Sequence, residues 1–130
     1  MENLLFFSLI FALFINFGIG AIDYSGVNRT FLSMYRGIFE CSVSQVNEYG
    51  EPVPPFFDKE RLENYIVNYF EQNLTRYVTH YKAAIYYFDD EDQTVCTSSY
   101  CSSVRISLDC EINYFFHFTK ARNYYINEQL

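Results

Sequence analysis

The sequence lacks tryptophan and is short of glycine, proline, histidine and positive charge. Its 130 residues include no Trp, 5 Gly, 3 Pro and 2 His, and 9 Lys and Arg stand against 16 Asp and Glu. The net charge of −7 argues against a nucleic-acid-binding protein, because such proteins present basic surfaces. It also gives little attraction to anionic lipid. The sequence contains no internal repeat and no low-complexity tract.

Catalytic motifs are missing as well. The sequence has no G-x-S-x-G elbow, no glycine-rich phosphate loop and no H-E-x-x-H metal motif. His80 and His117 have no partner motif, so we expect ordinary surface or half-buried histidines rather than catalytic bases. Asp109 and Glu111 share one strand face, which a solvated sheet surface also explains. We predict no catalytic residue, no cofactor and no enzymatic activity.

The chain has four cysteines, which are Cys41, Cys96, Cys101 and Cys110. None forms a CxxC pair or lies at ligand spacing to a histidine, so we expect no metal site. Four cysteines are consistent with two disulfides outside the cytoplasm, and three pairings are open. We predict a Cys96–Cys101 bridge across a turn-rich loop and a Cys41–Cys110 bridge between the first helix and the sheet. Alternatively, some of these cysteines are buried small hydrophobic residues.

The most prominent feature that is present is an apolar stretch near the N-terminus. Between Leu4 and Ile22 the only polar side chains are Ser8 and Asn16. A helix of this length, at ~1.5 Å of rise per residue, spans a bilayer core of ~30 Å. The stretch therefore predicts a membrane helix within residues 1–22.

A cleaved signal peptide is the alternative for this stretch. Gly18, Gly20 and Ala21 are small residues of the kind that precede a cleavage site. The opening Met1-Glu2-Asn3, however, lacks the basic region that signal peptides carry, and the apolar run is long for a signal core. We favour a retained membrane helix.

The orientation of the chain is predicted from two opposing features. Arg29 and Arg36 follow the apolar stretch, and the positive-inside rule alone would place the remainder in the cytoplasm. The four cysteines favour an oxidising compartment instead. We give the cysteines more weight and expect residues 23–130 to form one extracytoplasmic α+β domain, since about this length supports a single core.

Beyond the apolar stretch, the apolar residues thin into a stripe with helical spacing of i, i+3, i+4 and i+7. The members are Tyr24, Val27, Phe31, Met34, Tyr35, Ile38 and Phe39. We predict one long helix that ends near Gln45 or Val46, with Gly18, Gly20 and Gly26 loosening the joint between its halves. The residues expected to make helix-packing contacts are Phe17, Tyr24, Phe31, Tyr35 and Ile38.

A second helix is predicted after a proline-rich connection over Asn47–Pro55. Asp58 is a suitable N-cap residue. The apolar positions that follow have helical spacing and predict a face buried in the core. They are Leu62, Tyr65, Ile66, Tyr69, Phe70, Leu74 and Tyr77.

The remaining segments predict a small antiparallel sheet of three to four strands. Val78–Phe88 is rich in aromatic and β-branched residues, and Thr94–Ser99 is a candidate second strand after an acidic turn at Asp89–Gln93. Apolar and polar residues alternate over Val104–Thr119, which predicts one long strand with Cys110 on its apolar face. Ala121–Asn127 is a last strand or an extended tail.

The segment Phe17–Tyr24, which reads FGIGAIDY, closes the apolar stretch with small, apolar, acidic and aromatic residues. It resembles the end of the membrane helix in pilin-like proteins, and most of all in the TadE-like minor pseudopilins of tight-adherence pilus systems. This resemblance implies assembly in a surface pilus or secretion apparatus, with the membrane and other pilin-like proteins as partners of the N-terminal helix. A secreted, disulfide-stapled binding or effector protein is the alternative.

Overall fold

The computed structural model describes residues 2–89, 94–113 and 116–126. Within them, the chain forms three helices and five strands, which confirms the predicted α+β class. In chain order the elements are α1 (Glu2–Ser33), α2 (Tyr35–Ser42), β1 (Val43–Val46), β2 (Pro52–Phe57), α3 (Lys59–Asn73), β3 (Tyr81–Phe88), β4 (Ser103–Glu111) and β5 (His117–Tyr125).

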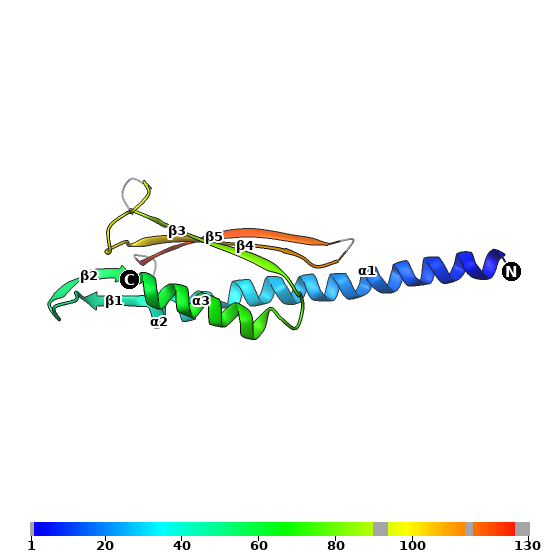
Figure 1. Ribbon diagram of the computed structural model, residues 1–130, viewed down its shortest axis with the longest axis horizontal. Helices are drawn as coiled ribbons and strands as arrows, with labels where there is room; N and C mark the ends of the chain where they lie inside the picture. The colour runs from blue at the N-terminus through cyan, green and yellow to red at the C-terminus, as the bar shows by residue number, and fades with distance from the viewer. Residues whose placement is uncertain (1, 90–93, 114–115, 127–130) are drawn as a thin grey trace.

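Helices α1 and α2 together form one long, bent helix. The bend lies at Met34, whose carbonyl still accepts a hydrogen bond of 3.1 Å from the amide of Ile38. Much of α1 projects beyond the rest of the protein (Figure 1). The predicted long helix is therefore confirmed as far as Ser42. The prediction that the helix continues to Gln45 or Val46 is wrong, because Val43–Val46 forms strand β1 instead.

Strands β1 and β2 form an antiparallel hairpin in the region predicted to be an irregular connection. The Asn47 side chain accepts hydrogen bonds of 2.9 Å from the amides of Tyr49 and Glu51, and Gly50 has a positive φ of 79°. An edge strand has backbone amides that point away from its partner strand and need no hydrogen bond within the sheet. Proline, which has no N–H, is therefore tolerated in β2. The connection predicted at Asn47–Pro55 thus ends earlier, at Glu51.

Helix α3 agrees with the sequence pattern. The carboxylate of Asp58 accepts a hydrogen bond of 3.2 Å from the amide of Arg61 and so caps the helix start, as predicted. Leu62, Ile66 and Phe70 are buried on one face. Because the helix ends at Asn73, the last two members of the predicted stripe lie in the following turn.

Strands β3, β4 and β5 form an antiparallel sheet in that order. Strands β4 and β5 pair from Ser103 opposite Tyr125 to Glu111 opposite His117. The single long strand predicted over Val104–Thr119 is therefore wrong, because the chain reverses after Glu111. The alternation was nevertheless informative, since Cys110 and Phe118 pair with each other and are both buried.

Two other predicted strands differ from the structure. Val78–His80 precede β3, which begins at Tyr81. Over residues 94–99 the described chain makes a single isolated bridge, between Val95 and Phe88, in place of a strand. The last predicted strand is largely the second half of β5. The acidic turn at residues 90–93, the middle of the predicted long strand at 114–115 and residue 127 lie outside the described residues.

The core lies between one face of the sheet and the helices (Figure 1). Burying each large apolar side chain there contributes about 1.5–3 kcal/mol of favourable transfer free energy. The largest side chains in this core that are fully buried are Tyr124, Phe31, Phe57, Phe70, Phe118, Met34, Ile38, Leu62, Ile66, Leu74, Ile106 and Leu108. The opposite face of the sheet carries exposed residues such as Tyr86, Asp109 and Thr119.

Candidate functional site

The N-terminal half of α1 is an exposed apolar surface. Most large apolar side chains between Leu4 and Ile22 are exposed to solvent, with exposed fractions between 46% and 76%. The helix is long and apolar enough to cross a membrane. Its most apolar stretch has a mean hydropathy of 2.3, and only 6% of that stretch is buried in the protein. Monomeric soluble proteins rarely expose an apolar surface of this extent. This half of α1 is therefore a candidate membrane anchor or signal sequence.

The C-terminal half of the long helix is instead part of the core. Val27, Phe31, Met34 and Ile38 are fully buried and follow one another at intervals of four, three and four residues. This spacing places them on one face of the helix, which contacts the sheet and α3. The amphipathic stripe predicted from the sequence is thus confirmed as an internal packing face.

The five predicted helix-packing residues fall into different environments. Phe31 and Ile38 are fully buried inside the protein, and Tyr35 is half-buried against the core. Phe17 and Tyr24 remain 52% and 39% exposed. Of the five, only these last two are accessible to another protein, so the buried residues pack within the protein's own core.

The joint between the two halves of α1 is tightly packed and not loosened by its glycines. Gly20 is buried under the side chains of Asn113 and Phe116, and Gly26 is buried under the ring of Tyr77. A Cβ atom at either glycine would collide with those side chains, whereas one at Gly18 would meet open space. Gly20 and Gly26 therefore permit close approach between α1 and the segments that cover it.

The turn between β4 and β5 makes the contact at Gly20. The side-chain amide of Asn113 donates a hydrogen bond of 2.9 Å to the backbone carbonyl of Asn16 in α1. The ring of Phe116 lies between those of Phe17 and Tyr24, at centroid distances of 5.2 and 5.9 Å. These contacts tie the sheet to the apolar half of α1. Periodicity did not predict them, because they join residues almost one hundred positions apart.

A hydrogen bond from Tyr69 holds helix α3 to the long helix. The Tyr69 hydroxyl donates a hydrogen bond of 2.7 Å to the Thr30 carbonyl, and the Thr30 hydroxyl donates one of 2.8 Å to the Gly26 carbonyl. Burial raises the pKa of the Tyr69 phenol, so the hydroxyl keeps its donor proton at neutral pH.

The predicted Cys96–Cys101 disulfide is present. It closes a loop that is attached to both sheets. The Phe57 amide of β2 donates a hydrogen bond of 2.8 Å to the Cys101 carbonyl, and the Cys96 amide donates one of 2.9 Å to the Tyr87 carbonyl of β3. The bridge therefore links the β1–β2 hairpin to the three-stranded sheet.

The predicted Cys41–Cys110 bridge is not formed. Cys41 is an exposed free thiol and Cys110 a buried one. Helix α2 packs near the other end of the sheet, where Phe39 contacts the Tyr124 ring opposite Val104. Cys110 lies six residues beyond Val104, about 20 Å along the strand at ~3.4 Å per residue. Burial, and secondarily Asp109, raises the pKa of the Cys110 thiol to about 11, so the thiol stays protonated at neutral pH.

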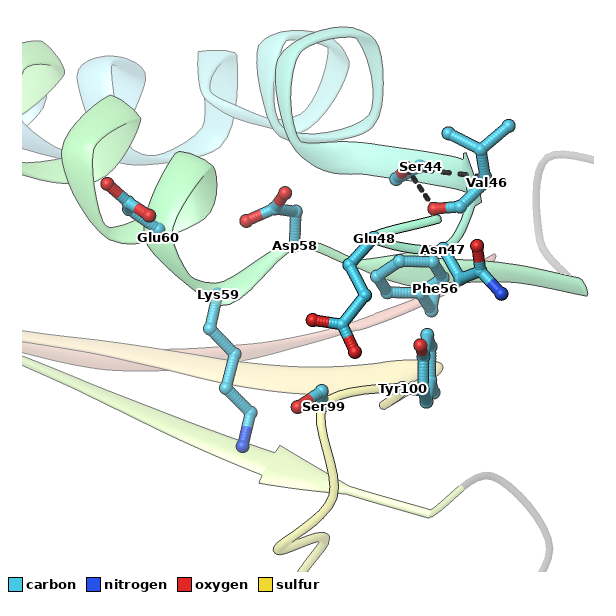
Figure 2. A pocket seen from close by; sticks show the side chains of 10 residues that line it. All are labelled: Ser44, Val46, Asn47, Glu48, Phe56, Asp58, Lys59, Glu60, Ser99 and Tyr100. Carbon is cyan, nitrogen blue, oxygen red and sulfur yellow. Dashed lines mark hydrogen bonds between the residues drawn. The ribbon is translucent and has the colours of Figure 1, made fainter. Parts of the chain in front are cut away.

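A shallow groove opens between the β1–β2 hairpin, the start of α3 and the disulfide loop (Figure 2). Glu48, Asp58 and Glu60 line it, and the ammonium of Lys59 lies over the Tyr87 ring, 4.8 Å from the ring centroid. The Asp58 carboxylate is already engaged as the cap of α3. The rings that form the apolar wall are Phe56 and Tyr100, with centroids 4.8 Å apart.

The two histidines lie in a second shallow groove at the end of the sheet nearest the β4–β5 turn. His117 is paired with Asp109 at 2.6 Å, and both side chains are more than half exposed. His80 and Glu111 line the same groove. Over residues 2–89, 94–113 and 116–126, no three His, Cys, Asp or Glu side chains are grouped so that they could hold a metal ion.

No protein-family model, no curated protein and no solved structure matches this chain. The second groove is lined by Cys110 as well as by the two histidines, but burial raises the pKa of the Cys110 thiol and keeps it protonated at neutral pH. The surface that distinguishes the protein from an ordinary soluble domain is therefore the exposed half of α1.

The packing at Gly20 leads to a testable pair of variants. We expect Gly20→Ala to open the β4–β5 turn, because the new methyl group must displace Asn113 and Phe116, at a cost of about 1–3 kcal/mol. Amide hydrogen exchange at Phe116 should accelerate about 10-fold for each 1.4 kcal/mol. Gly18→Ala is the control because its Cβ meets open space. Equal exchange in the two variants would contradict the contact.

The cysteine arrangement is tested by alkylation followed by intact-mass measurement. The folded, unreduced protein should gain one label, at Cys41, because Cys110 is buried and the other two cysteines are bridged. Denaturant without reductant should expose Cys110 and allow a second label. Reduction in denaturant should allow four. An unreduced, denatured chain that takes up no label would mean that Cys41 and Cys110 are bridged after all.

Proposed function

We propose that this protein is a membrane-anchored structural protein whose domain lies outside the cytoplasm and which assembles with other proteins through α1. The observation that carries the proposal is the exposed apolar surface from Leu4 to Ile22. In water this surface would be costly, whereas lipid tails or the apolar faces of other helices would cover it. A helix also satisfies its own backbone hydrogen bonds, as a bilayer requires.

The disulfide supports the proposed orientation. Disulfides form and persist mainly in oxidising compartments, and the Cys96–Cys101 bridge lies in the domain that follows α1. Arg29 and Arg36 are exposed on α1 and α2, in the part of the long helix whose other face is buried in the core. They belong to the surface of the domain, which weakens their value as a signal for a cytoplasmic location.

The arrangement also supports the finer proposal of a minor pseudopilin. Pilin-like proteins combine an exposed apolar helix with an amphipathic continuation that packs on a small α+β domain, and this chain has the same sequence of features. In that role, α1 would pack laterally with the apolar helices of like proteins. No chemistry would be required of either groove.

A secreted protein freed by signal peptidase is the second candidate, because an apolar helix near the N-terminus suits a signal sequence equally well by length and composition. Cleavage after Gly20 or Ala21 would spare the core residues from Val27 onward. It would remove Asn16 and Phe17, however, together with their contacts to Asn113 and Phe116. These contacts favour retention of the helix.

Anchoring is tested by the state of the mature protein. N-terminal sequencing should find the apolar stretch intact, and the protein should remain in the membrane pellet after alkaline carbonate extraction. Leu9→Arg together with Leu13→Arg should release it, since each charge costs about 2.5–3.5 kcal/mol at the middle of a membrane helix. Tyr86→Arg, on the exposed face of the sheet, is the control and should remain bound. A mature chain that begins at Ala21 or Ile22 would refute anchoring.

Assembly is tested by a photo-crosslinking amino acid placed at Phe11 in cells of the source organism. We expect adducts in which Phe11 is joined to the apolar N-terminal helix of another protein chain, as identified by mass spectrometry of the joined peptides. The same amino acid at Tyr86 is the control for nonspecific capture. Adducts to lipid alone at Phe11 would support an anchor and refute assembly through α1.

A further inference from the structure

The β4–β5 turn reaches a part of α1 that the proposed membrane placement immerses. The segment without charged residues between Glu2 and Asp23 covers the 20 residues from Asn3 to Ile22, or ~30 Å at ~1.5 Å per residue. This length matches the ~30 Å core of a bilayer, so the outer boundary of the core falls close to Asp23. Asn16 lies seven residues earlier, about 10 Å deeper.

The turn is packed against this stretch of α1. Asn113 is hydrogen-bonded to the Asn16 carbonyl, and Phe116 contacts Phe17 on one side and Tyr24 on the other. The portion of α1 before Asn16 is shorter than a bilayer core, at about 18 Å for Leu4 to Ile15. The domain therefore cannot stand clear of the membrane while α1 spans it in this conformation.

We propose, on the basis of the membrane anchoring above, that the end of the β4–β5 hairpin is a second membrane contact. Its described residues, Ile112, Asn113 and Phe116, lie beside α1 in the outer part of the acyl-chain layer, between the headgroup boundary near Tyr24 and the depth of Asn16, about 10 Å below it. The partner is the lipid bilayer itself. The hairpin end is continuous with the exposed surface of α1, so one bilayer covers both.

The chemistry of this hairpin end suits the interfacial layer. Trp and Tyr side chains concentrate at that depth, and the ring of Tyr24 contacts that of Phe116 there. Described backbone groups at the hairpin end are hydrogen-bonded within it. The Ile112 amide donates a hydrogen bond of 3.1 Å to the Phe116 carbonyl, and the Phe116 amide donates one of 3.2 Å to the Asn113 side chain. Backbone groups paired in this way enter an apolar layer at low cost.

Ionisable side chains begin immediately above the turn. Glu111 and His117 lie opposite each other where β4 and β5 start to pair, and both are exposed. His117 also contacts Asp109, which lies further from the turn. The headgroup layer is only about 5–8 Å thick on each side of the core, which is enough to hold these ionisable groups in a hydrated environment. This change from apolar to ionisable residues sets how far the hairpin can enter the acyl-chain layer.

The absence of tryptophan from the natural chain allows the depth to be measured directly. In the full-length protein reconstituted in phosphatidylcholine vesicles, Phe116→Trp should show blue-shifted emission. Quenching should be stronger with lipids brominated near the headgroup than with lipids brominated near the chain end. Phe11→Trp reports the anchor and should be quenched most by the deep bromines. Tyr86→Trp, on the exposed sheet face, should be quenched by aqueous iodide and by neither lipid.

The outcomes separate the hairpin contact from the anchor. Quenching of Phe11→Trp without quenching of Phe116→Trp refutes the hairpin contact and leaves the anchor standing. Loss of quenching at both positions refutes both. Stronger quenching of Phe116→Trp by deep than by shallow bromines refutes the placement in the outer part of the acyl-chain layer. If Phe116→Trp fails to fold, as judged by Cys110 becoming open to alkylation, Ile112→Trp takes its place with the same expectations.

Discussion

The packing of one face of the long helix against the sheet and α3 is the interaction on which the rest of the structure depends. Val27, Phe31, Met34 and Ile38 occupy the centre of the core, so the domain cannot form without the helix that also carries the apolar surface. A helix is suited to both tasks because its backbone hydrogen bonds are internal, whether its side chains meet protein or lipid. The change from exposed to buried therefore needs no break in the chain, only a change in what covers the helix, and that change begins at Gly20.

Phenylalanine and tyrosine rings contribute a network of contacts to this packing. Phe31 and Phe118 meet edge to face, and Tyr35 and Phe39 both contact Tyr124. Such pairs add about 0.5–1.5 kcal/mol each beyond the burial of their area. Tyrosine also supplies hydrogen bonds at the margin of the core, as Tyr69 does to Thr30. Arg122 lies over the rings of Tyr35 and Tyr124, where a cation is attracted by their π faces. The high content of Tyr and Phe thus corresponds to a core that is built from ring contacts.

Much of the fold was predictable because its signals are local. The helical stripe, the Asp58 cap and the alternation around Cys110 each depend on residues close in sequence. The errors arose where a distant contact decides the structure. The chain reverses after Glu111 without a glycine or proline signal, because Asn113 closes the turn with its own side chain and rests on α1. Val43–Val46 leaves the helix because it pairs with the later segment Pro52–Phe57. The apolar half of α1 could be predicted from the sequence, whereas its contact with the β4–β5 hairpin could not.

The extent of contact along the helix bears on the kind of function that the domain can have. Contacts between the long helix and the domain run from Asn16 to Phe39, over about 35 Å at ~1.5 Å per residue. A binding domain that searches for a ligand from a membrane is commonly joined to its anchor by a flexible linker, which leaves its orientation free. Here no linker separates the apolar half of α1 from the domain, since α1 enters the core directly. The domain therefore holds a fixed orientation relative to the apolar helix. A fixed orientation has little value for a tethered receptor, but it is what a subunit needs if neighbouring copies or partners are to be placed in register, and it favours a structural role.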